Sequence, residues 1–317
     1  KIKLKQKKSK LKSEKIKLKQ IIIMSSSNSS FNQRTLHWCL KVGNLSQCLS
    51  VCCDLLGMKV LRHEEHPGSC DAECNGAFDG RPWSKTMIGF GDSEYDAFVL
   101  EITYTYGICS YKKGNDLRFI QITLPSDQAL SAIMKKGDLS EPIVRMAEGY
   151  QFDLVVSDKK QDHTPFISGI ALSCTDLKQT KTFWVDTIGL KQLDDGVFAF
   201  DPPIDRTQSL TRLIFVQSEK KPIDHAQAYG RIAFSTRQDI DKLYECVVNS
   251  QFGSSAVYKK PVVLGTPGKN TVTVVILLDP DGYEICFVDE KGFDQLSRLK
   301  PGDDHIDWKK RIELGSK

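Results

Sequence analysis

The chain contains one folding pattern twice. The segment Leu36–Leu61 superposes without a gap on Ser168–Leu193. Identical residues occupy informative positions of the two segments: Leu45 with Leu177, Asp54 with Asp186, and Gly57 with Gly189. In each segment an apolar strand leads into a polar turn and an amphipathic helix, and a glycine stands where the helix would end. Repetition of a whole unit predicts two similar modules, with a ligand site where they face each other.

The later parts of each copy extend the pattern. Leu117–Leu124 matches Gly230–Ser235 as a middle strand, and further helices are predicted around Ser126–Lys136 and Arg237–Asn249. Asp279–Gly282 has the composition of a tight turn, with proline in its second position. These elements predict an α+β fold of two tandem modules, whose curved mixed sheets face a cleft.

The two copies differ in their closing strands and in one loop. The stretch E-G-Y-Q-F-D-L-V, which starts at Glu148, carries Asp153 where D-P-D-G-Y-E-I-C-F-V, which starts at Asp279, carries Cys286. The first copy is also longer before its middle strand. We assign its additional residues to a loop at 63–85.

The domain boundaries follow from the repeat and from changes in composition. We predict a leader at 1–33, a first module at 34–157, a linker at 158–165, a second module at 166–291 and a C-terminal tail at 292–317. The leader contains K-I-K-L-K-Q twice and is rich in lysine and serine. We interpret it as a disordered basic segment, or as translated upstream sequence before a start at Met24.

The net charge argues against nucleic acid as a partner. The formal charge of the whole chain is +4, yet residues 1–19 alone hold ten lysines and one glutamate. The remaining sequence is therefore mildly acidic and has no basic stripe of the kind that binds nucleic acid. No apolar run is long enough to predict a membrane span, and no stretch reads as a secretory signal.

The cysteines favour an intracellular protein. There are ten of them, without a C-x-x-C pair, so reduced thiols are more plausible than a disulfide framework or a zinc ribbon. We predict a cytoplasmic location, with mitochondria as the alternative. Cys48 and Cys52 have helical spacing and predict buried packing. Cys70 and Cys74 lie in a polar loop and are candidates for redox-sensitive thiols.

Three motifs connect the chain to a known family. H-W-C-L-K-V-G-N-L, F-V-L-E-I-T-Y-T-Y-G and D-P-D-G-Y-E-I resemble stretches of the glyoxalase I family, within the vicinal oxygen chelate superfamily. The resemblance covers about residues 35–300. It implies paired βαβββ units, either a pair in each module or a single pair in total. It also implies an octahedral metal held by four side chains from both modules, which polarises hemithioacetal oxygens while a ligand carboxylate moves the proton.

The resemblance implies which residues stand at the ligand positions. Two ligands come from the first and fourth strands of one module, here His37 and Glu101, and two from the middle and last strands of the other, here Arg231 and Cys286. A second site would combine residues that cannot hold a metal as a set: Phe119, Asp153, Gly169 and Phe215. An arginine stays cationic and repels a divalent ion. We therefore expect the first site to bind Zn, Ni or Mn weakly or not at all.

Several interpretations of the first site remain open. Arg231 would replace the metal as a fixed positive charge beside Glu101, the two acting as the catalytic pair on a small carbonyl metabolite or a glutathione-type thiol adduct. Alternatively, Cys286 completes a working metal site with His37 and Glu101, as in a lactoylglutathione lyase. The same residues would also fit a buried polar network in a non-catalytic binding or scaffold protein.

Three further residues are candidates for ligand contacts. Lys41 follows His37 on the same predicted strand and would meet a carboxylate of a thiol conjugate. Trp83 and Lys85 fall in the long first-module loop and would form part of a lid over the cleft. We expect a monomer or a homodimer, with a small molecule as the main partner and neither nucleic acid nor a membrane.

Overall fold

The computed structural model describes residues 33–297 apart from 96, 159–163, 202–209 and 266–270. One compact unit starts at Gln33. The predicted leader, apart from Gln33, and most of the predicted C-terminal tail lie outside the described residues. Within them, no helix is long and apolar enough to cross a membrane.

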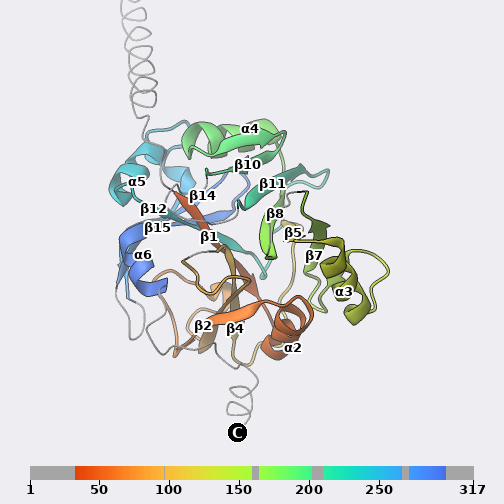
Figure 1. The fold of residues 1–317 in the computed structure, drawn as a ribbon. Helices are drawn as coiled ribbons and strands as arrows, with labels where there is room; N and C mark the ends of the chain where they lie inside the picture. Colours follow the sequence, from red (N-terminus) through yellow and green to blue (C-terminus); the bar gives the residue numbers. More distant parts are fainter. Residues whose placement is uncertain (1–32, 96, 159–163, 202–209, 266–270, 298–317) are drawn as a thin grey trace, which may run out of the picture. The chain divides into compact units, whose positions relative to one another are not determined.

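Two mixed sheets form the framework of this unit (Figure 1). The eight-stranded sheet has this order: β13 (Val257–Leu264), β14 (Val272–Leu278), β15 (Glu284–Asp289), β12 (Arg231–Thr236), β1 (Arg34–Lys41), β4 (Val99–Thr105), β3 (Trp83–Gly89), β2 (Lys59–His66). The seven-stranded sheet has this order: β6 (Ile143–Arg145), β7 (Gln151–Val156), β5 (Leu117–Leu124), β8 (Phe166–Cys174), β11 (Arg212–Gln217), β10 (Val197–Ala199), β9 (Lys191–Asp194). The predicted α+β class with curved mixed sheets is confirmed.

Each sheet contains strands from both copies of the repeat. β1 of the first copy pairs antiparallel with β12 of the second, with His37 opposite Ala233. β5 of the first copy pairs in the same manner with β8 of the second, with Ile120 opposite Ile170. In Figure 1 the red β1 accordingly lies beside the blue-green β12, although they are far apart in the sequence. The copies therefore share their hydrogen-bonded sheets.

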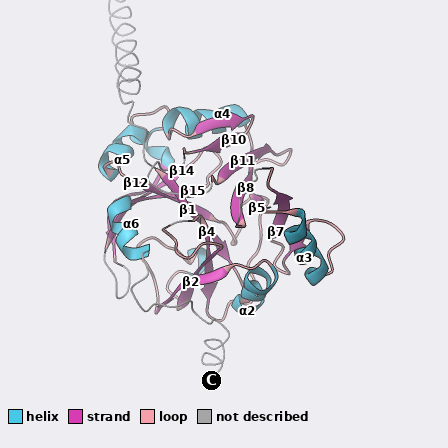
Figure 2. Ribbon diagram, viewed as in Figure 1, coloured by secondary structure: helices cyan, strands magenta, loops and turns pink. Residues whose placement is uncertain are grey.

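The helices flank the sheets (Figure 2), and two of them, α2 and α3, recur in the second copy as α4 and α5. They are α2 (Leu45–Leu49), α3 (Asp127–Gly137), α4 (Leu177–Lys181), α5 (Ile240–Val248) and α6 (Glu290–Ser297), with short 3₁₀ turns at Gly76–Phe78 and Gly253–Ala256. α2 and α4 both continue into a π-helical turn, at Ser50–Leu55 and Thr182–Thr187. Both turns are followed by a glycine with positive φ, at Gly57 and Gly189, as the repeat predicts.

The repeated helix starts with the same kind of cap in both copies. The side chain of Asn44 accepts a hydrogen bond from the backbone N–H of Gln47. The side chain of Asp176 accepts from the N–H groups of Lys178 and Gln179. Such caps satisfy backbone donors that have no partner inside the helix, so the polar turn before each helix fixes where the helix begins.

Alternation along the strands sorts the side chains between two faces of the eight-stranded sheet. One face enters the main core, where Trp38, Leu100, Ile232 and Phe287 are fully buried. The other carries a smaller apolar cluster of seven residues: Leu36, Ala233, Val272, Val274, Val288, Phe293 and Leu296. Helix α6 contributes the last two of these residues and packs on β12, β14 and β15. This second face holds the site.

Candidate functional site

A cavity of about 390 Å³ lies against the second face of the eight-stranded sheet. Strand parity explains its lining. Odd-numbered positions of β1, β3, β4 and β12 and even-numbered positions of β15 point to this side, as do even-numbered positions of β2 from Arg62 onwards, after an irregularity in the strand. The register places Cys39 beside Glu101 across β1 and β4. It also places Ala233 between His37 and Cys286 across β1, β12 and β15. Strands of both copies thus build one site.

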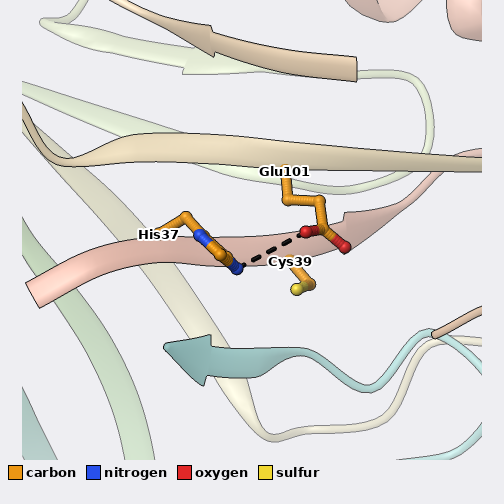
Figure 3. A group of neighbouring side chains, drawn as sticks. All are labelled: His37, Cys39 and Glu101. Carbon is orange, nitrogen blue, oxygen red and sulfur yellow. Dashed lines mark ion pairs between the residues drawn. The ribbon is translucent and has the colours of Figure 1, made fainter. Parts of the chain in front are cut away.

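The structure brings His37, Cys39 and Glu101 together (Figure 3). His37 Nε2 lies 3.4 Å from Glu101 Oε2, and one potential ligand atom from each of the three residues lies within 4.8 Å of the others. Burial lowers the pKa of His37, an effect that the nearby Glu101 only partly opposes. The imidazole is therefore neutral at physiological pH. Its buried Nδ1 has no hydrogen-bond partner among the described residues.

Lys85 supplies the cation closest to Glu101. Lys85 Nζ lies 3.9 Å from Glu101 Oε2 and 3.9 Å from Glu64 Oε2. Burial alone would raise the pKa of Glu101, but the charge of Lys85, with help from His37, holds it at about 2. Burial likewise opposes the charge on Lys85, and Glu101 more than compensates by raising the pKa of that ammonium. Both groups are charged inside the cavity wall.

A second buried ion network supports Lys85 from β2. Arg62 Nε donates to Glu94 Oε1 at 2.5 Å and its second terminal nitrogen donates to Glu94 Oε2 at 2.9 Å. Arg62 also pairs with Glu64. His66, at the end of the same strand, stacks on Trp83 with ring centroids 4.0 Å apart. The bidentate pairing with Glu94 fixes Arg62, so Lys85 is the less constrained of the two cations.

Arg231 lies in the cavity wall but has another partner. Its Nε donates to Glu284 Oε2 at 2.7 Å, and a terminal nitrogen donates to the Ala72 carbonyl at 2.8 Å. The expected pairing of Arg231 with Glu101 is therefore corrected: the structure pairs Arg231 with Glu284 and places Lys85 beside Glu101. The reason is register, since Arg231 and Glu284 are direct neighbours across β12 and β15.

The other residues selected from sequence divide between the cavity and the interior. Cys286 lines the cavity, and burial raises the pKa of its thiol to about 11. Trp83 and Lys85 also line it, but from strand β3 and not from the expected lid loop. Lys41 does not line the cavity. Its ammonium donates to the Tyr229 carbonyl at 2.6 Å and lies 3.6 Å from the centre of the Tyr229 ring.

The second set of predicted positions falls in the seven-stranded sheet. Phe119 and Asp153 lie on β5 and β7, while Gly169 and Phe215 lie on β8 and β11. Asp153 accepts a hydrogen bond from Gln151 at 2.7 Å, and Phe215 packs against Trp184 in the main core. Across the described ranges, the group of His37, Cys39 and Glu101 is the one set of three or more potential metal ligands.

Sequence reasoning did not select Cys39, Arg62, Glu64 or His66. Cys39 follows His37 by two positions, and this spacing on a strand is a signal that both side chains share a face. Glu64 and His66 fall in the segment 63–85 that was assigned to a loop, whereas β2 extends to His66 and β3 begins at Trp83. The apolar and charged residues of β2 do not alternate strictly, because Arg62 and His66 line the cavity while Lys59 and Glu65 pair with residues outside it.

The donor set fits some metals better than others. The octahedral four-ligand set that the resemblance implies is incomplete, because Arg231 and Cys286 stand at two of its positions. His37, Cys39 and Glu101 are the ligand types of a zinc site with an open position. However, burial raises the pKa of Cys39 well above its usual range, and the Lys85 ammonium lies near the same Glu101 oxygen that would bind the ion. A metal ion would have to displace the proton of the Cys39 thiol and bind beside the positive charge of Lys85.

Comparison with known proteins places these observations in context. A sequence model described as the C-terminal domain of glyoxalase domain-containing protein 4-like proteins matches residues 176–296. Glyoxalase domain-containing protein 4 of Rattus norvegicus is 40% identical over 281 residues, covering 85% of this chain and 89% of the rat protein. Glyoxalase 1 of Caenorhabditis elegans is 38% identical over 270 residues, covering 84% and 92%. The crystal structure of glyoxalase I from Zea mays is similar in fold, with a TM-score of 0.65 at 21% identity, covering 83% and 95%.

Proposed function

Because the chain belongs to the glyoxalase domain-containing protein 4 family, we propose that its cavity binds a small carbonyl compound or the adduct of that compound with a glutathione-type thiol. The observation that carries the proposal is the ion pair of Lys85 and Glu101, with neutral His37 beside it, at one part of a cavity whose other wall is apolar. Ligand cavities of this size are typically apolar with a few polar groups that fix the orientation.

The charged part of the cavity suits a polarised carbonyl. The Lys85 ammonium is a hydrogen-bond donor that would stabilise a carbonyl oxygen or the oxyanion that forms from it. The Glu101 carboxylate, ionised and 3.9 Å from that ammonium, would accept a proton from the carbon next to the carbonyl. Neutral His37 presents a buried Nδ1 without a hydrogen-bond partner among the described residues, and this atom would donate to or accept from the ligand.

The apolar wall suits the rest of such a ligand. Val272, Val274 and Val288 from β14 and β15 line it together with Phe293 and Leu296 from α6. These side chains exclude water from one side of the charged group, which strengthens electrostatic interactions with a bound ligand. Arg231, held by Glu284, adds a fixed positive charge at the wall. We keep its role in binding an anionic group as a prediction.

Titration calorimetry and an isomerisation assay test the proposal together. The probe is the hemithioacetal of glutathione with a 2-oxoaldehyde, beside glutathione alone. Lys85→Met and Glu101→Gln should each weaken binding by about 10- to 100-fold, the effect of losing a hydrogen bond to a charged group. The matched control is Lys59→Met, since Lys59 lies on the same sheet, is 43% exposed and pairs with Asp92 outside the cavity.

The outcomes separate the proposal from the alternatives. If the wild-type protein binds the probe without turnover, and both cavity variants lose that binding, the protein is a binding protein for this ligand class. Turnover lost in both variants would identify an enzyme. No binding of either probe by the folded wild-type protein would overturn the proposal and favour a scaffold that recognises another partner.

A metal-dependent isomerase of the lactoylglutathione lyase type is the second candidate, and one specific observation favours it. His37, Cys39 and Glu101 could hold a divalent ion such as Zn²⁺, Ni²⁺ or Mn²⁺. The ion would act as a Lewis acid on the ligand oxygens. Elemental analysis of protein purified without chelator, compared with His37→Ala and Cys39→Ser, tests this candidate. Stoichiometric metal in the wild-type protein that both variants lose would support this candidate. Wild-type protein that is purified without metal and takes up none when dialysed against a metal salt would exclude it.

A further inference from the structure

Two cysteines face each other on the loop that joins β2 to β3. The Sγ atoms of Cys70 and Cys74 lie 3.0 Å apart, and the backbone N–H of Cys74 donates to Cys70 Sγ at 3.2 Å. Both side chains are partly exposed and both line the cavity. A disulfide needs the two sulfur atoms only about 1 Å closer than this contact.

The backbone between the two cysteines is held in the conformation that brings them together. Glu73 has a φ of 51°, in the left-handed region that non-glycine residues seldom adopt, and its N–H donates to the Cys70 carbonyl at 2.8 Å. The second copy of the repeat secures this turn. Lys259 lies 3.2 Å from a Glu73 carboxylate oxygen, and Arg231 donates to the carbonyl of Ala72. The close contact of the thiols is therefore built into the fold.

The surroundings distinguish the two thiols chemically. The hydrogen bond from Cys74, together with the backbone N–H groups of Cys74 and Ala72 and the nearby Lys85 ammonium, lowers the pKa of Cys70 to about 6. The same hydrogen bond and burial raise the pKa of Cys74 well above its usual value. At neutral pH Cys70 is a thiolate and Cys74 is its proton-bearing neighbour, a nucleophile beside a resolving thiol.

We propose that Cys70 and Cys74 form a reactive dithiol site in the cavity wall, which a hydroperoxide converts into a disulfide. The Cys70 thiolate attacks the terminal peroxide oxygen, the O–O bond breaks, and the alkoxide or hydroxide that leaves takes up a proton from solvent to become an alcohol or water. The resulting sulfenic acid, Cys70–SOH, is attacked by Cys74. The S–S bond forms, and the hydroxyl group leaves with the Cys74 proton as water. The two thiols lose two electrons and the peroxide gains them.

The other close thiol pair of the chain provides a natural comparison. Cys48 and Cys52 have the same four-residue separation, but both are fully buried in the main core. A hydroperoxide cannot reach them without unfolding of that core. Cys109 is exposed, but no other thiol contacts it among the described residues. The site at 70 and 74 therefore combines access with a resolving partner.

Peptide mapping tests the proposal on the full chain. Trypsin releases residues 63–85 as one peptide, because Arg81 precedes proline, and this peptide contains no cysteine besides Cys70 and Cys74. Brief treatment with hydrogen peroxide should leave it two hydrogens lighter, while the peptide 42–59 keeps its thiols reduced. Cys74→Ser should stop at a sulfenic acid that dimedone traps, and Cys70→Ser should do neither.

A pH profile adds a readout that does not depend on oxidation. Alkylation of Cys70 by iodoacetamide should be half-maximal near pH 6, whereas an ordinary thiol shows its midpoint near about 8.5. Retention of both thiols in peptide 63–85 at a peroxide dose that oxidises Cys109 would overturn the proposal, as would a midpoint near that of an ordinary thiol. Glu101→Gln should weaken ligand binding but leave disulfide formation intact, so failure of this site and failure of the proposed function are separate results.

Discussion

Removal of the Lys85 ammonium should expose the cost of a buried Glu101 carboxylate. The two charges lie 3.9 Å apart, both largely shielded from solvent. At an effective dielectric constant of about 20, Coulomb's law gives roughly 4 kcal/mol of attraction at that separation. In the Lys85→Met variant the Glu101 carboxylate stays buried beside neutral His37, and every remaining cation is farther away. We therefore expect the free energy of unfolding to fall by about 3–5 kcal/mol at pH 7.

The pH dependence of that loss has a definite sign. In the wild-type protein the folded pKa of Glu101 is about 2, below its ordinary value of 4.5. This depressed pKa contributes about 3 kcal/mol of stability above pH 4.5, and the contribution disappears as the pH falls towards 2. In Lys85→Met the folded pKa of Glu101 rises, because burial now acts without the opposing charge. The deficit of the variant should therefore shrink as the pH is lowered from 7 to 5.

Urea unfolding of a double-mutant cycle measures the coupling. The set consists of wild type, Lys85→Met, Glu101→Gln and the double variant, each at pH 7 and pH 5, with Lys59→Met as the exposed control. The double variant should recover most of the loss, giving a coupling free energy on the order of 2–4 kcal/mol at pH 7. A coupling below about 0.5 kcal/mol would refute the reasoning, because that is the behaviour of a solvent-screened surface pair.

Two other perturbations test buried ion pairs of the fold. Arg231→Met should lower the free energy of unfolding by about 3–5 kcal/mol in urea titrations, because it strands the buried Glu284 carboxylate; equal stability of Arg231→Met and wild type would contradict this expectation. His225 contacts Asp116 at 3.2 Å and the Asp281 carbonyl at 2.8 Å, and although burial lowers its pKa, these hydrogen bonds raise it further than burial lowers it. The stabilising effect of the His225 imidazolium is present below pH 6.5 and is lost as the pH rises through the folded pKa. The Tm of the wild-type protein should therefore fall more between pH 6 and pH 8 than the Tm of His225→Gln. Parallel Tm curves would show that the imidazolium contributes nothing.

The sequence alone predicted the repeated elements of the fold, because the same residue pattern occurs in both copies. The match of Leu36–Leu61 with Ser168–Leu193 predicted the same strand, turn and helix in both copies, and the structure reproduces even the π-helical turn that precedes each terminal glycine. The predicted helices at 126–136 and 237–249 correspond to α3 and α5 within a few residues. Such elements depend on local periodicity and caps, which a single sequence contains.

The extent of the long loop could not be predicted in the same way. Charged residues fill β2 where a half-buried strand usually alternates with apolar ones, so R-H-E-E-H resembles a polar loop. Those charges are tolerated because Arg62 and Glu64 pair with each other on the cavity side, and Glu94 completes the network from outside the strand. Strand pairing at long range, rather than local preference, decides this segment.

The location of the positive charge at Glu101 depends on register, and this is the main point on which the site differs from its sequence-based prediction. A family position identifies which strand a residue occupies, but the partner of a long side chain is set by the neighbour across the sheet. Arg231 faces Glu284 on β15, so its charge is already neutralised there. Glu101 faces Met87 on β3, and Lys85, two positions along that strand on the same face, is the cation within reach. The cavity therefore places the Lys85 ammonium at the Glu101 carboxylate, and any ligand or metal that binds there must either pair with that ammonium or displace it.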